Sequence, residues 1–367
     1  MIAALAAHGG TASGWLVGEP CVEPPEVVRE ALVLAARSPS FPYPPAAGLP
    51  RLREVLADRH REGGAPASPE QIVVTAGAKA GLLALLAALL EPGDELIHPL
   101  PCYPAYPAMA RRLGAQPVPV PESGGSFDGW TEAVAGRIGP RTRAVVLASP
   151  SNPSGATLTS DQAQDLVELC RDRGVRLICD EAYGAFRFAA GTEKIAADFD
   201  PRRHTVVQLQ SVSKTWALCG WRIGWVVADA DLAAAVAARH TALLNPASGP
   251  PQAAMATLPR VPGAYLEAAR AAVQGRVESV VAGLQGNGLE VRRPSGGFYL
   301  WLDIEEIAMR AGVAGSPELC LTLARDHGVG LWPGEDFGGS LHVRLAVTAP
   351  TPERWDEALG NLLQALR

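Results

Sequence analysis

Short apolar segments alternate with helical patterns through the middle of the chain. Six segments of four to six residues are rich in Val, Ile and Leu and are predicted strands, at residues 71–75, 95–98, 143–148, 175–180, 205–209 and 223–228. Helical patterns follow the first and third of these segments, over residues 77–90 and 160–173. Apolar strands that alternate with helices are typical of a mainly parallel sheet covered on both faces. The pattern therefore predicts an α/β fold with a three-layer α/β/α domain.

The pattern changes after about residue 250. The elements expected there are helices at 263–285, 317–327 and 352–366 and strands at 297–303 and 342–346. This mixture predicts a smaller α+β domain. The Pro-rich stretch 245–251 is typical of a joint between domains. We therefore expect a large domain over residues 21–250 and a small domain formed by residues 1–20 and 251–367.

Composition and charge describe an ordinary globular protein. Hydrophobic residues make up 48% and charged residues 19% of the 367 residues. The formal net charge of -6 gives no general attraction to phosphate backbones, so we expect no nucleic-acid partner. Six scattered cysteines without a C-x-x-C pair are typical of reduced thiols and favour neither a disulfide framework nor a metal site. We interpret Cys179 and Cys219 as small core residues.

No segment predicts attachment to a membrane. The longest apolar run, residues 82–90, is too short to span a bilayer. Residues 1–7 are apolar, but they lack the basic region and cleavage pattern of a signal peptide. We therefore expect a cytoplasmic protein with no membrane partner.

One lysine has the surroundings of a reactive amine. Lys214 follows a predicted strand in the segment Ser211-Val212-Ser213-Lys214-Thr215-Trp216, and Arg222 lies beyond a short loop. A lysine amine condenses with an aldehyde, while hydroxyls and a guanidinium can bind a phosphate dianion nearby. An isolated S-x-S-K string is more often a surface loop, so this interpretation depends on the other segments.

Three further segments place polar groups at strand ends, where ligands bind in parallel sheets. Asp180 ends the strand 175–180, and a buried carboxylate needs a cation such as a protonated pyridine nitrogen. Asn152 lies in the Pro-rich turn after residue 148 and can direct its amide at a ring oxygen. Small residues at 75–79 would let a phosphate approach the N–H groups of a helix start. Taken alone, each also fits an ordinary strand end or tight turn.

The chain has no G-x-x-x-x-G-K-[ST] phosphate loop, and no G-x-G-x-x-G follows a strand. In their order, however, the segments resemble the class I/II family of fold-type I aminotransferases, which depend on pyridoxal 5′-phosphate (PLP). The resemblance covers nearly the whole chain. Its markers are Gly18-Glu19-Pro20, Tyr43 with residues 48–53, residues 75–79, 92–95, 101–104 and 152–155, Asp180 to Tyr183, Ser213-Lys214 with residues 220–222, Pro333-Gly334 with Phe337-Gly338, and Val343-Arg344-Leu345.

The resemblance implies PLP-dependent transferase fold type I and catalytic roles for three residues. Lys214 would hold PLP as a Schiff base and then carry a proton between the substrate α-carbon and the cofactor. Asp180 would pair with the pyridine nitrogen. Tyr183 and Asn152 would donate hydrogen bonds to the phenolic oxygen of the ring, and Tyr103 would stack on its face.

The resemblance also implies binding sites for a phosphate and a carboxylate. The phosphate would be held by Gly77, Ala78, Lys79, Ser211 and Arg222. Tyr43 would reach the phosphate of a neighbouring subunit, so the family pattern implies a homodimer that works in amino-acid metabolism. The substrate α-carboxylate would be bound by Arg344, assisted by Gly18 and Asn152.

Three features near the substrate entrance depart from the family pattern: a short segment before Gly18, the pair Cys21-Val22, and the Pro-rich residues 245–259. They leave the substrate open. Lys79 suits either a distal substrate carboxylate or the phosphate. The first hypothesis is transfer of an amino group from an L-amino acid to a 2-oxo acid. Elimination, cyclisation or oxidation of an amino acid would use the same cofactor residues, and a non-catalytic ligand sensor is a third hypothesis that the acidic charge disfavours.

Overall fold

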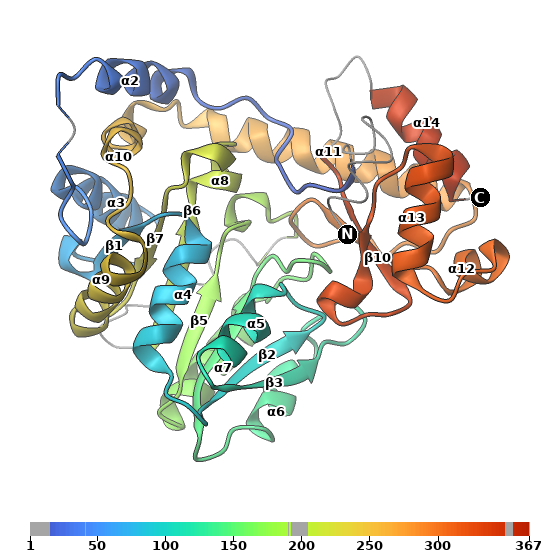
Figure 1. Cartoon of the computed structure of the whole chain (residues 1–367), viewed down its shortest axis with the longest axis horizontal. Coiled ribbons are helices and arrows are strands. Elements are labelled where there is room, and N and C mark those ends of the chain that lie inside the picture. The colour runs from blue at the N-terminus through green and yellow to red at the C-terminus, as the bar shows by residue number, and fades with distance from the viewer. Residues whose placement is uncertain (1–14, 41, 190, 192–204, 349–354, 367) are drawn as a thin grey trace.

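The structure is a computed structural model that describes residues 15–40, 42–189, 191, 205–348 and 355–366. It contains a seven-stranded sheet and a three-stranded sheet, each packed against helices (Figure 1). The predictions for residues 1–14 and for 352–354, the expected start of the last helix, lie outside the described residues. No helix in the described part of the chain is both long and apolar enough to cross a membrane.

The seven-stranded sheet has the order β1-β7-β6-β5-β4-β2-β3. Its strands are β1 (Ile72–Thr75), β2 (Glu95–Leu100), β3 (Gln116–Pro121), β4 (Thr142–Ala148), β5 (Arg176–Asp180), β6 (Val206–Ser211) and β7 (Gly224–Val227). Only β7 runs antiparallel to its neighbours. The predicted α/β fold with a mainly parallel sheet is confirmed.

Helices cover both faces of this sheet, and each face buries its own cluster of apolar side chains. On one face lie α4 (Ala78–Leu89), α5 (Ala105–Arg112) and α9 (Ala230–Leu244). On the other face lie α6 (Trp130–Ala135) and α7 (Ser160–Asp172). A third cluster packs α2 (Glu26–Ala36), α3 (Pro50–Glu62) and α10 (Gly249–Met255) against β1 and β7.

The remaining elements form the second body of the fold, orange to red in Figure 1. Its sheet has the order β8-β10-β9, and one apolar cluster joins this sheet to its helices. The elements are α11 (Ala264–Gly286), β8 (Tyr299–Asp303), α12 (Glu305–Ala311), α13 (Ser316–His327), β9 (Trp332–Pro333), β10 (His342–Ala346) and α14 (Trp355–Ala365). Short helical turns complete the described chain: η2 (Pro69–Gln71), η3 (Gly184–Phe186), α8 (Val212–Thr215), η4 (Cys219–Trp221), η5 (Leu258–Arg260) and η6 (Gly334–Phe337).

The stretch 245–251, expected as a joint between domains, contains the start of a helix. Helix α10 begins at Gly249 with proline in its first turn, a position where a proline needs no N–H donor. Ala254, Met255 and Leu258 are buried in the cluster that contains α2 and α3. We therefore propose that the boundary between the domains lies nearer Val261 than residue 250.

Candidate active site

A cavity of about 610 Å³ lies at the carboxyl ends of β4, β5 and β6 and extends to β10. The parallel direction of these three strands brings their ends to one edge of the sheet, as expected for a ligand site. All but two of the predicted site residues line it: Gly18, Ala78, Lys79, Tyr103, Asn152, Asp180, Tyr183, Ser211, Lys214, Arg222 and Arg344. The exceptions are Gly77, which directly precedes Ala78, and Tyr43.

The amine of Lys214 lies inside this cavity. β6 ends at Ser211, whose Oγ accepts the N–H of Ser213 at 3.1 Å and so starts the turn α8 that carries the lysine. Lys214 Nζ donates to the backbone oxygen of Gly18 and lies 3.6 Å from Cys219 Sγ. Cys219, expected to be a core residue, is only partly buried and lines the cavity; burial raises the pKa of its thiol.

Asp180 is a buried carboxylate without a cationic partner among the described residues. It is 7% exposed, and its Oδ1 accepts the N–H of Ala182 at 3.1 Å. Its Oδ2 accepts the hydroxyl of Tyr106 at 2.9 Å. Burial raises the pKa of Asp180 to about 6, although both hydrogen bonds lower it. An anion held in this way would be stabilised by any cation that enters the cavity.

Two tyrosines of the site were not predicted from the sequence. Tyr106 of α5 is fully buried, and burial raises its pKa well above the usual value, so it stays a neutral donor to Asp180. Tyr299 of β8 shares a hydrogen bond of 2.8 Å with the hydroxyl of Tyr183. The only signal for either residue is an aromatic side chain in an amphipathic segment, which is common in any core.

The opposite end of the cavity is suited to a phosphate. Gly77 precedes α4 with φ of +87°, and a Cβ atom there would lie 2.4 Å from Arg222 Nη2. The backbone also passes close by at Gly224, where a Cβ atom would meet the N of Ala78 at 2.5 Å. The first N–H groups of α4 have no partner within the helix, and Ala78 and Lys79 at this helix start line the same cavity as Ser211 and Arg222.

Arg344 of β10 is a buried cation, with 5% of its surface exposed. Its Nη1 donates to Asn152 Oδ1 at 3.1 Å and its Nη2 to the backbone oxygen of Leu16 at 2.9 Å, while Nε has no partner. The guanidinium carbon lies 4.4 to 5.1 Å from the ring centres of Tyr299, Trp332 and Phe337. In the part of the chain that the structure describes, no acidic side chain pairs with this arginine, so it can receive a carboxylate from a ligand.

Lys79, Tyr103 and Tyr43 occupy different positions. Lys79 Nζ lies 5.7 Å from the ring centre of Tyr103, and both side chains line the cavity. Tyr43 is 84% exposed and does not reach the cavity of its own chain. Among the described residues, no group of three or more His, Cys, Asp and Glu side chains could hold a metal ion.

The fold and this cavity define an α/β protein in which a lysine amine, a buried carboxylate and a buried guanidinium share one cavity. A family described as "Aminotransferase class I and II" matches residues 13–362 of the sequence. The chain belongs to this family, whose members depend on PLP, and it is an aminotransferase. Transamination, the first hypothesis drawn from the sequence, is confirmed.

Relatives with assigned activities are similar over most of the chain. A probable aspartate/prephenate aminotransferase of Aquifex aeolicus is 31% identical over 99% of this chain and 93% of its own length. An arginine–pyruvate transaminase of Pseudomonas aeruginosa is 36% identical over 90% of this chain and 84% of its own. Thermus thermophilus aspartate aminotransferase with maleate has a TM-score of 0.88 at 30% identity and covers 99% of this chain and 94% of that chain.

A further solved structure shows that the fold serves several substrates. N-succinyldiaminopimelate aminotransferase from Mycobacterium tuberculosis has a TM-score of 0.89 at 28% identity. The alignment covers 99% of this chain and 95% of that structure. The relatives therefore share the fold and the type of reaction, while their names differ in the substrate.

Proposed function

We propose that this aminotransferase moves an amino group from an L-amino acid to a 2-oxo acid, using PLP bound covalently by Lys214. One observation carries the proposal. The same cavity joins the Lys214 amine, the buried Asp180 carboxylate and the buried Arg344 guanidinium. Neither buried charge has a partner of opposite charge among the described residues, so each is available to a ligand.

The cavity fits PLP at each of its polar positions. Asp180 would face the ring nitrogen, and its need for a cation supports that placement. Gly77 to Lys79, Ser211 and Arg222 would hold the phosphate. When bound, PLP supplies an electron-withdrawing ring that stabilises negative charge on the substrate α-carbon.

The other steps, which are substrate binding, orientation and proton transfer, depend on side chains of the protein. Arg344 would hold the α-carboxylate with the N–H groups that its bonds to Asn152 and Leu16 leave free, Nε among them. Because a guanidinium only donates, its bond to Asn152 Oδ1 turns the Asn152 amide so that Nδ2 is the group left to donate to a ring oxygen. Tyr183 shares its hydroxyl with Tyr299 and can donate to the same oxygen. Lys214 Nζ would carry a proton from the α-carbon of the donor to the cofactor, and in the second half of the reaction from the cofactor to the α-carbon of the acceptor.

The donor is proposed only as a class. The relatives are named for aspartate, prephenate, arginine with pyruvate, and N-succinyldiaminopimelate, so their names do not select one side chain. Lys79 is a cation at the cavity wall that suits either a distal carboxylate or the phosphate. We also propose a cytoplasmic enzyme, which the six unpaired cysteines support.

The first test is a single-turnover experiment on the purified protein loaded with PLP. A panel of L-amino acids is added without any 2-oxo acid, and products are measured by mass spectrometry. We expect one donor to release one equivalent of its 2-oxo acid per site and then stop, and an added acceptor to restore turnover. Continuous release of ammonia or product without an acceptor would contradict the proposal.

The matching variant is Lys214→Ala. We expect turnover to fall at least about 10³-fold, because the residue serves as both covalent anchor and proton carrier. Borohydride reduction should fix PLP covalently to the wild-type protein and not to the variant, as read from the intact mass. Lys79→Ala serves as control, since that lysine should leave the covalent bond intact.

A further inference from the structure

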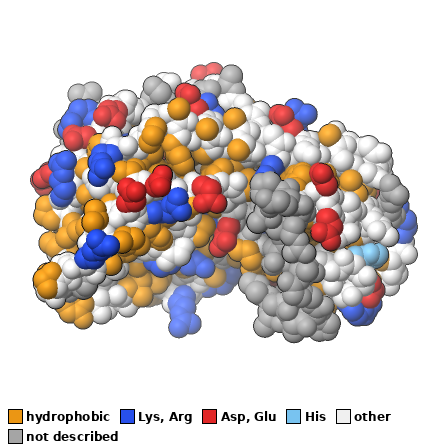
Figure 2. All heavy atoms as spheres, turned by 90° about the horizontal axis from the view of Figure 1, so that it is seen from above, with side chains coloured by type: hydrophobic (Ala, Val, Ile, Leu, Met, Phe, Trp, Pro, Cys, Tyr) orange, Lys and Arg blue, Asp and Glu red, His pale blue; other side chains and the backbone are white. Residues whose placement is uncertain are grey.

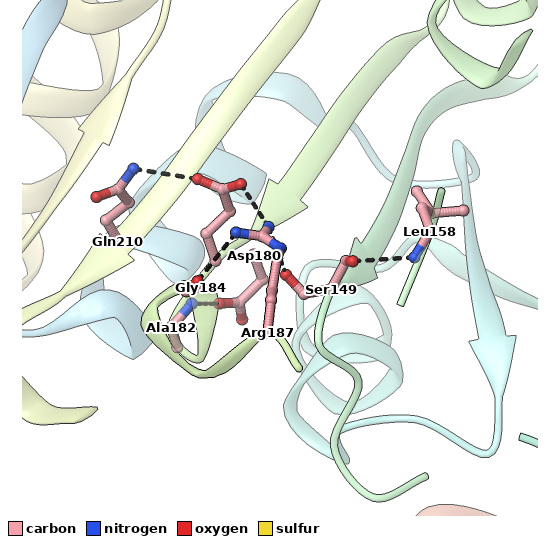
Figure 3. Close-up of polar contacts among 8 residues, drawn as sticks. Ser149, Leu158, Asp180, Ala182, Gly184, Arg187 and Gln210 are labelled. Carbon is pink, nitrogen blue, oxygen red and sulfur yellow. Dashed lines mark hydrogen bonds and ion pairs between the residues drawn. The ribbon is translucent and has the colours of Figure 1, made fainter. Parts of the chain in front are cut away.

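The side chains of Arg187 and Glu181 together connect the ends of three neighbouring strands (Figure 3). The Arg187 side chain is 6% exposed. Its Nη2 donates to the backbone oxygen of Ser149 and to Glu181 Oε1, both at 2.9 Å, and its Nη1 donates to the oxygen of Gly184 at 3.1 Å. The other carboxylate oxygen of Glu181 accepts Nε2 of Gln210 at 3.1 Å.

Each anchor of this network is next to a residue of the cavity. Ser149 follows β4 in the turn that carries Asn152. Glu181 follows Asp180 at the end of β5, and Gln210 precedes Ser211 at the end of β6. Successive side chains along a strand point to opposite faces of the sheet. The network therefore lies on the side away from the cavity, and Arg187 itself does not line it.

The network affects Asp180 in two ways: it holds the turn that follows Asp180, and it balances the negative charge of Glu181. The turn is held by the N–H of Gly184, which donates to the oxygen of Glu181 at 2.9 Å, and it presents the N–H of Ala182 to Asp180 Oδ1. Burial is the main cause of the raised pKa of Asp180, and the negative charge of Glu181 raises it further. A cation paired with Glu181 offsets the second effect.

We propose that Arg187 is a positioning residue that keeps the Asp180 carboxylate charged and directed at the cofactor by neutralising Glu181 and tying together the ends of β4, β5 and β6. The inference rests on the proposed function, in which Asp180 pairs with the ring nitrogen of PLP. A lysine at position 187 would keep the charge but not the planar, rigid set of donors that holds these acceptors.

The pH dependence of Asp180 depends on few groups. Those around it are Tyr106 from α5, Glu181 and Tyr183 from the following turn, and Lys214 across the cavity, while Cys179 precedes it in β5 on the opposite face of the sheet. Burial raises the pKa of both phenols and of the thiol well above neutral. Among these groups, Asp180 with its pKa of about 6 is therefore the one on which a change in PLP affinity just below neutrality reports.

The test compares two arginines that contact β5 at opposite ends. Arg187→Met removes the network and leaves Glu181 without its cation. Arg176→Met is the matched control, because it breaks the ion pair of 2.7 Å between Arg176 and Asp229 at the amino end of the same strand. A double variant, Arg187→Met with Glu181→Gln, removes the unpaired negative charge as well.

The measurement is the dissociation constant of PLP, from quenching of tryptophan fluorescence in apoprotein across a range of pH. Arg187→Met should weaken binding about 10- to 100-fold, with the larger loss at lower pH, as when other groups that orient a ligand from behind are removed. Arg176→Met should stay within about twofold of the wild type, and the double variant should recover most of the loss.

Wild-type affinity and pH profile in Arg187→Met would overturn the inference, and so would an equal loss in Arg176→Met. If Arg187→Met does not fold, Arg187→Lys takes its place: it keeps a charge beside Glu181 and loses the planar donors, so PLP binding should weaken while the pH profile stays close to that of the wild type, and wild-type affinity would overturn the inference. Failure of the proposed function is a different result, because the wild-type protein itself would then not bind PLP, and the inference would fall with it.

Discussion

Burial without an acidic partner distinguishes Arg344 from the surface arginines of this chain. Three aromatic rings and two neutral oxygens surround its guanidinium, so its positive charge is not balanced within the described residues. Such a charge is costly to bury unless a ligand completes the pair. The free energy gained when a carboxylate arrives is therefore available for substrate binding.

Replacement of this arginine should affect the substrate and spare the cofactor. We expect Arg344→Ala to raise KM for the donor about 100-fold, since hydrogen bonds between charged groups contribute about 1.5 to 3 kcal/mol each. PLP should remain bound at wild-type stoichiometry. Steady-state kinetics of the variant, with the exposed Arg293→Ala as control, measure the effect. An unchanged KM would remove Arg344 from the proposed role.

The residues that could be predicted are those that lie in local motifs at strand ends. Lys214, Asp180 and Asn152 are of this kind, because a short apolar strand followed by polar residues can be recognised in the sequence. Tyr106 could not be predicted, since it lies 74 positions from the Asp180 that it contacts. Its role depends on how α5 packs against the sheet, which no local pattern specifies.

At the scale of elements, proline accounts for two differences between prediction and structure. β3, with the sequence QPVPVP, was not predicted because proline cannot donate to a sheet ladder. The strand is tolerated because it lies at the edge and pairs only with β2. In α10 the prolines lie in the first turn, where they favour a helix rather than a joint.

The end of β3 carries a carboxylate that should make stability depend on pH. Burial raises the pKa of Glu122 to about 7, although Ser154 and Arg292 lower it. The folded protein therefore binds a proton that the unfolded chain, with a pKa of 4.5, has already released. Stability should fall as pH rises from about 4.5 to 7 and stay lower above that range.

Glu122→Gln removes this dependence, because glutamine resembles the protonated acid. We expect the variant to be more stable than the wild type at pH 8 by about 1 to 3 kcal/mol and nearly equal to it at pH 4.5. Urea unfolding at both pH values measures the difference. Glu132→Gln, at an exposed position of α6, should show none of it. A wild type whose stability rose from pH 5 to 8 relative to the variant would contradict the assignment.

At the scale of the whole molecule, several large apolar side chains are exposed on α2 and at the end of α9. Val33 and Leu34 of α2 are 56% and 63% exposed, Leu243 and Leu244 at the end of α9 about half exposed, and Tyr43 is 84% exposed. Figure 2 shows hydrophobic side chains gathered over the part of the molecule that carries α2. Exposed apolar side chains of this kind are typical of an interface, and on this ground we propose the homodimer that the family pattern implies.

Light scattering after size exclusion tests the dimer. We expect the wild type to have twice the mass of one 38.4 kDa chain. Leu34→Glu should shift it toward the monomer and weaken PLP binding, because a charge would be buried in the interface and the partner's Tyr43 would be lost. Met309→Glu, on the 68% exposed methionine of α12, should change neither property. A monomeric wild type that binds PLP would contradict the proposal.

The aromatic rings around Arg344 should determine how substrate binding responds to salt. Dissolved ions weaken attraction between exposed charges because they gather around them, and this effect falls off for charges that solvent cannot surround. Tyr299, Trp332 and Phe337 surround the guanidinium, of which solvent reaches only the side that lines the cavity. The affinity of Arg344 for a substrate carboxylate should therefore depend little on salt concentration, and the enzyme would tolerate large changes in ionic strength.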